Sequence, residues 1–184
     1  MSVSREVEVL ILPGLGSSGP DHWQSHWERR DASLRRVEQR DWETPHCDDW
    51  VRTLDAAVRG SDVPLVLVGH SSACAMVAHW VAQAPRESLA KIAGALLVAP
   101  SDPLGPNYPP GPRGFAGVPL AKLPFRTIVV CGDDDPYVTL KQAGEYADAW
   151  GADLVILPGA GHINTASGHG EWEEGFALLE RLRR

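Results

Sequence analysis

The sequence feature that most constrains the fold is a strand, a sharp turn and a helix that follow one another without a gap. Residues 65–68 read Leu-Val-Leu-Val, an apolar run without polar alternation, which is typical of a strand buried on both faces. Apolar residues then return at helical spacing, at Ala73, Met76, Val77, Trp80, Val81 and Ala84. Only Gly69, His70 and Ser71 are left to reverse the chain between them.

A turn this tight predicts a nucleophile elbow, in which a serine on a strained strand-to-helix turn raises its hydroxyl above the sheet. Small residues are needed on both sides of Ser71, because the backbones of the strand and the helix nearly touch. Gly69 meets this need, and Ala73 stands where the G-x-S-x-G pattern has its second glycine. A helix that begins at Ser71 would aim the N–H of Ser72 and the positive helix end at the attacked group. The alternative is an ordinary turn with a helix-capping serine.

Strand and helix patterns alternate along the chain, which predicts one α/β domain over residues 1–184 with a parallel sheet. Six strands are expected, at 7–12, 34–37, 65–68, 92–98, 127–131 and 154–157. The 34–37 strand is charged and is expected at the sheet edge. Helices are expected to begin near residues 20, 44, 71, 139 and 171.

Residues 101–124 interrupt this alternation. They hold seven of the fifteen prolines and four glycines, which predicts a long irregular loop. Loops of this length inside a domain are usually functional, so we expect this one to form a wall of a shallow pocket. The alternative is a plain surface connection.

The composition is that of a soluble globular protein, with 43% hydrophobic and 22% charged residues. A formal net charge of -7 argues against nucleic acid as a partner. No apolar run approaches the roughly 20 residues of a membrane helix, and no signal peptide is visible. Cys47, Cys74 and Cys131 lie far apart without a C-x-x-C pair, so we expect buried thiols and a cytoplasmic location rather than disulfides or a zinc site.

Three chemically matched residues follow three of the predicted strands. In a parallel sheet, sites form at the carboxyl ends of the strands. Ser71 follows one strand, the acids 133–135 follow another, and His162 follows the last. The order Ser, Asp, His is that of the α/β-hydrolase triad. We therefore predict that Ser71 is a nucleophile and that His162 takes its proton, the alternative for His162 being a loop residue that caps a backbone group.

Further motifs extend over nearly the whole chain. They are Leu12-Pro13-Gly14, Asp21-His22-Trp23-Gln24-Ser25-His26-Trp27-Glu28, Gly69-His70-Ser71-Ser72, Asp134-Asp135-Pro136-Tyr137-Val138, and Gly161-His162-Ile163-Asn164 with Gly168 and Trp172. With these motifs the chain resembles the α/β-hydrolases, and specifically the small family of the retinoblastoma-binding protein 9 and YdeN-type serine hydrolases. The resemblance implies a minimal hydrolase core without a cap domain, helices on both faces and sheet order 2-1-3-4-5-6. The chain lacks a Leu-x-Cys-x-Glu segment, so binding to a retinoblastoma-type pocket is not implied.

The resemblance also favours one of three neighbouring acids. The acid of the family immediately precedes a proline, as Asp135 does, so Asp135 is preferred over Asp133 and Asp134. Asp135 would fix the tautomer of His162 and stabilise its imidazolium. Asp133 and Asp134 are expected to cap backbone amides in their loop.

Backbone N–H groups of Leu15 and Ser72 are the predicted oxyanion-binding donors. Gly14, His70 and Tyr108 are candidate residues of the substrate pocket, with a packing role equally open for His70. These assignments complete a candidate site at the carboxyl edge of the sheet.

Two other patterns would point to a bound cofactor or metal. Gly14-x-Gly16-x-x-Gly19 spells a dinucleotide fingerprint, but Pro20 would clash inside the first helical turns that this fingerprint requires. His22 and His26 are spaced as metal ligands on a helix, without the H-E-x-x-H pattern. We therefore predict no cofactor and no metal.

The sequence thus predicts a serine hydrolase that cleaves small carboxylic esters through an acyl-enzyme, with amides or peptides as less favoured substrates. The alternative is a catalytically silent protein-interaction module on a hydrolase fold, which Ala73 and the short chain favour. A nucleotide-binding oxidoreductase is the third reading, and a thermal shift with NAD would indicate it.

Overall fold

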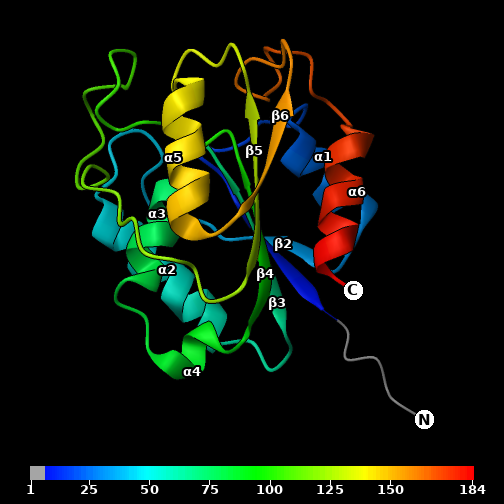
Figure 1. Ribbon diagram of the computed structural model, residues 1–184. Coiled ribbons are helices and arrows are strands. Elements are labelled where there is room, and N and C mark those ends of the chain that lie inside the picture. The colour runs from blue at the N-terminus through cyan, green and yellow to red at the C-terminus, as the bar shows by residue number, and fades with distance from the viewer. Residues whose placement is uncertain (1–6) are drawn as a thin grey trace.

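Six strands pair in the order β2-β1-β3-β4-β5-β6, and every neighbouring pair is parallel (Figure 1). This computed structural model describes residues 7–184. The strands are β1 (Glu8–Leu12), β2 (Leu34–Arg36), β3 (Leu65–His70), β4 (Ile92–Val98), β5 (Arg126–Gly132) and β6 (Asp153–Leu157). The predicted α/β class, the six parallel strands and their order are therefore confirmed.

Helices cover both faces of the sheet, as Figure 1 shows. On one face lie α2 (Cys47–Arg59), α3 (Ser72–Val81) and α5 (Leu140–Trp150), and on the other lie α1 (Trp23–Arg30) and α6 (Glu173–Leu182). Along β3, Leu65 and Leu67 pack on the first face, whereas Val66 and Val68 pack on the second. This burial on both sides explains why the strand is apolar at every position.

Three helices begin later than predicted. The cap of α1 is His22, whose Nδ1 accepts a hydrogen bond from the Gln24 N–H at 3.1 Å, so the helix begins after Pro20. His46 caps α2 in the same way. Histidine is not among the usual capping residues, so the sequence pattern did not indicate these starts. The last helix begins at Glu173 rather than at residue 171.

A short helix was not predicted from the sequence. It is α4 (Arg86–Leu89), which links α3 to β4 and is too short to show a helical period. The predicted cap of α5 is present, since Thr139 Oγ1 accepts a hydrogen bond from the Gln142 N–H at 3.1 Å.

The predicted irregular loop between β4 and β5 is confirmed, and it is anchored to the body of the protein. Residues 101–124 contain no named helix or strand. Arg113 exchanges backbone hydrogen bonds with the start of α2, at 2.8 Å to the Cys47 N–H and 2.9 Å to the Pro45 oxygen. Phe115 is buried, with its ring 5.3 Å from that of Trp50. These anchors hold the middle of the loop against α2.

The three cysteines are free, and all three are buried, as the sequence predicted. Burial raises the pKa of the Cys47 thiol to about 12 and raises that of Cys74 as well, so these thiols stay protonated at neutral pH. Within residues 7–184, every helix is too short or too polar to cross a membrane.

Candidate active site

Ser71 occupies the turn between β3 and α3 in a backbone conformation that non-glycine residues rarely adopt, with φ 59° and ψ -124°. The Ser71 backbone N–H donates to the Val98 carbonyl oxygen at 3.0 Å, and the Ser71 carbonyl oxygen accepts from the Cys74 N–H at 3.0 Å. The turn is therefore held from both sides, with α3 starting one residue after the serine.

The strand and the helix approach each other closely at Gly69. A Cβ at this position would lie 3.3 Å from Leu97 Cδ2 and 3.7 Å from the Ala73 backbone. Ala73 is fully buried on the helix side, so its methyl is accommodated without a second glycine. The turn has the geometry of a nucleophile elbow.

The loop after β1 packs directly against this elbow. A Cβ added to Gly14 would lie 2.9 Å from both the Ser71 Cβ and the His70 oxygen, so only glycine fits there. The next residue, Leu15, and the first helical residue, Ser72, line the same cavity as Ser71. Within residues 7–184 neither N–H donates to a protein acceptor, which leaves both available to an oxyanion.

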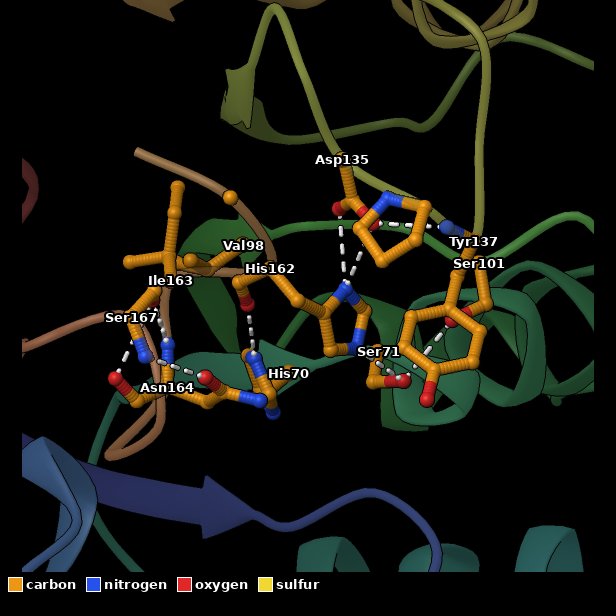
Figure 2. Close-up of polar contacts among 12 residues, drawn as sticks. His70, Ser71, Val98, Ser101, Asp135, Tyr137, His162, Ile163, Asn164 and Ser167 are labelled. Atoms are coloured by element: carbon orange, nitrogen blue, oxygen red, sulfur yellow. Dashed lines mark hydrogen bonds and ion pairs between the residues drawn. The ribbon is translucent and has the colours of Figure 1, made fainter. Parts of the chain in front are cut away.

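A histidine and an aspartate complete a line of contacts from Ser71 (Figure 2). His162 Nε2 lies 2.9 Å from Ser71 Oγ, and His162 Nδ1 lies 2.8 and 3.0 Å from the two Asp135 oxygens. The Tyr137 N–H donates to Asp135 Oδ1 at 2.8 Å and fixes the carboxylate. Because Nδ1–H donates to the carboxylate, the neutral ring has its lone pair on Nε2, facing the serine.

The two neighbouring aspartates make different contacts. Asp133 Oδ1 accepts from the Gly159 N–H at 2.8 Å, and Asp134 Oδ1 accepts from the Gly161 N–H at 2.7 Å. They bind backbone amides of the loop after β6, not of their own loop as the sequence suggested. Each therefore ties the loop that carries Asp135 to the loop that carries His162.

Two further buried histidines pack beside this site: His70 lies against His162, and His22 lies against His70. His70 Nε2 donates to the His162 backbone oxygen at 2.9 Å, and its ring lies 4.8 Å from that of His22. Burial lowers the pKa of His22 to about 4 and holds the pKa of His70 well below its usual value. Both rings are therefore neutral at pH 7.

We expect the low pKa of His22 to make the protein less stable in acid. Its pKa in the folded protein lies below the unfolded value of about 6.5, so the unfolded chain binds the proton first. The contribution of neutral His22 to the free energy of unfolding is fully present above the unfolded pKa of about 6.5. It declines by about 3 kcal/mol as the pH falls to 4.

The matched variant is His22→Asn, which replaces the capping Nδ1 acceptor with a side-chain oxygen and does not titrate. Urea unfolding at pH 7 and pH 4 should show a smaller loss for this variant, with His70 still contributing to the loss in both proteins. An equal loss of unfolding free energy in wild type and His22→Asn would contradict the low pKa assigned to His22.

A cavity of about 300 Å³ opens in front of Ser71. The candidate pocket residues Gly14, His70 and Tyr108 all line it, and Tyr108 OH lies 2.9 Å from Ser72 Oγ. The remaining lining residues include Leu15, Ser17, His22, Ser101, Asn107, Pro109, Tyr137 and Asn164. None of the lining side chains is a carboxylate, an ammonium or a guanidinium.

Sequence reasoning missed four of these side chains, Ser17, His22, Tyr137 and Asn164, as parts of the cavity, and it placed Ser101 there only as the first residue of the loop over 101–124. Ser101 had a usable signal, because it follows β4 at the same sheet edge from which the other site residues were found. No group of histidine, cysteine and acidic residues within 7–184 is arranged to hold a metal ion.

The parallel sheet, its strand order and the serine elbow after β3 define the chain as an α/β-hydrolase. The sequence pattern of the serine hydrolase family matches residues 9–181, so the chain belongs to this family. A crystal structure of a YdeN-like hydrolase from Pectobacterium atrosepticum is similar at 32% sequence identity and a TM-score of 0.84, over 97% of this chain and 91% of that chain. The predicted YdeN-type membership is confirmed.

More distant structures share the fold. The ydeN gene product of B. subtilis is 18% identical with a TM-score of 0.73, over 96% of this chain and 98% of that chain. A thermophilic esterase from Thermogutta terrifontis is 16% identical with a TM-score of 0.69, over 97% and 90% of the two chains. No curated protein sequence matches the chain.

Proposed function

We propose that this protein hydrolyses small carboxylic esters through a Ser71-His162-Asp135 triad and an acyl-enzyme. The observation that carries the proposal is the unbroken line of contacts from Ser71 Oγ through the imidazole to the buried carboxylate. A serine hydroxyl is a weak nucleophile unless a neighbouring base takes its proton. His162 is in position to be that base, and Asp135 to stabilise the cation that results.

In the acylation step, Ser71 Oγ forms a bond to the ester carbonyl carbon while its proton passes to His162 Nε2. The carbonyl oxygen becomes an oxyanion that accepts hydrogen bonds from the Leu15 and Ser72 N–H groups. When the intermediate collapses, the carbon–oxygen bond to the alcohol breaks and His162 gives its proton to the leaving oxygen.

In the deacylation step, a water molecule takes the place of the alcohol. It attacks the acyl carbon while His162 Nε2 accepts its proton, and the bond to Ser71 Oγ then breaks. The proton returns from His162 to Ser71, so the products are a carboxylic acid and the starting enzyme.

The cavity supports a preference for small substrates without charge. Its volume of about 300 Å³ is at the lower limit for a ligand pocket. Its walls carry hydroxyl and amide groups and the neutral imidazoles of His22 and His70, and no carboxylate, ammonium or guanidinium that could pair with a charged acyl group. Amides and peptides remain secondary candidates, and buried reduced thiols fit a cytoplasmic enzyme.

The test is hydrolysis of p-nitrophenyl esters of graded length by the purified protein. We expect the highest kcat/KM with acetate or butyrate and a steep decline toward laurate, because longer chains exceed the cavity. Turnover of none of these esters would overturn the proposal and favour a silent interaction module.

A further inference from the structure

A second serine touches the proposed nucleophile. Ser101, at the start of the loop after β4, places its Oγ 2.8 Å from Ser71 Oγ (Figure 2). Its side chain lines the cavity, yet the residue is only 3% exposed. Nothing in the triad mechanism requires this hydroxyl.

The surrounding hydrogen bonds fix which hydroxyl is the donor. His162 Nδ1 donates to Asp135, so His162 Nε2 accepts, and the single proton of Ser71 must be given to it at 2.9 Å. Ser71 Oγ therefore accepts from Ser101. Within residues 7–184 the Ser101 hydroxyl contacts no other hydrogen-bonding partner.

We propose that Ser101 is a positioning residue that holds the Ser71 oxygen and stabilises negative charge on it, an inference that rests on the proposed function. Charge builds on this oxygen as its proton moves to His162, and a hydroxyl donor binds a charged oxygen more strongly than a neutral one. In the acyl-enzyme the same oxygen is part of an ester and accepts poorly. The contact therefore matters when the Ser71 oxygen attacks and again when it leaves the second intermediate.

The contact also fixes a rotamer. Ser71 Oγ is held between Ser101 Oγ and His162 Nε2, so it is oriented for attack before substrate arrives. Because Ser101 acts on Ser71 and not on the bound ester, we expect its loss to lower kcat and leave KM nearly unchanged.

The experiment compares Ser101→Ala, Ser101→Thr and wild type in the rate of labelling by a fluorophosphonate, which reports attack by Ser71 alone. We expect labelling and kcat of Ser101→Ala to fall about 10- to 100-fold, since the lost bond is to a charged oxygen. Ser101→Thr keeps the hydroxyl and should recover most of the rate.

Ser88→Ala is the matched control, because Ser88 is an equally buried serine in α4, away from the site. It should label as fast as wild type. If Ser101→Ala does not fold, Ser101→Cys tests the same point, because a thiol is a weak donor and should also label slowly.

The two possible failures are distinguishable. Labelling of Ser101→Ala at the wild-type rate, with wild type still labelled at Ser71, overturns the role of Ser101 alone. A rate that falls equally in the Ala and Thr variants also overturns it, because the hydroxyl would then be irrelevant. Absence of labelling in wild type overturns the proposed function as well.

Discussion

Replacing Ser71 with alanine is expected to lower kcat for p-nitrophenyl acetate by about 10⁶-fold. The substitution removes the atom that forms the covalent bond, so no neighbouring group can supply the same step. Only the oxyanion donors and substrate binding remain, and these accelerate hydrolysis weakly. Steady-state hydrolysis with freshly purified variant measures the loss.

The fold should survive this substitution. The backbone of Ser71 makes its hydrogen bonds to Val98 and Cys74 through N–H and C=O groups that alanine retains. The melting temperature of Ser71→Ala should therefore stay within a few degrees of wild type. Residual hydrolysis at a tenth of the wild-type rate or more would mean that another residue is the nucleophile.

Replacing Asp135 with asparagine is expected to lower kcat by about 10⁴-fold. An amide has nearly the same shape, but its NH₂ group would favour the tautomer of His162 with the proton on Nε2. The ring could then no longer accept the Ser71 proton, and its cationic form would lose a buried counter-charge. Stopped-flow and steady-state hydrolysis at pH 7 and above measure the effect.

Asp133→Asn and Asp134→Asn are the matched controls, since all three acids are adjacent in the chain. Each of these side chains accepts one backbone N–H, which an asparagine oxygen also accepts. We expect kcat within severalfold of wild type for both. A loss of several thousandfold in either control, with Asp135→Asn active, would move the acid to that position.

Much of the architecture was predictable because it depends on local pattern. The strand at 65–68 is apolar at every position since both of its faces are covered, and the short turn at Ser71 favours an elbow over an ordinary capped turn. The sheet order, by contrast, came from the resemblance to a known family. Alternation of strands and helices predicts parallel pairing but not which strand lies beside which.

What the sequence did not show depends on contacts between distant residues. Ser101 and Ser71 are thirty positions apart, and their 2.8 Å contact exists only because β3 and β4 are neighbours in the sheet. The histidine caps of α1 and α2 were missed because a ring nitrogen rarely fills that role. Likewise, Asp133 and Asp134 reach the loop after β6 through pairing of β5 with β6.

The central claim is that Ser71 carries the acyl group, and peptide mapping by mass spectrometry of the fluorophosphonate-treated protein tests it most directly. We predict one adduct per chain, on Ser71, and its loss when the protein is unfolded before treatment. An adduct on Ser101 instead, or no adduct on the folded protein, would contradict the account.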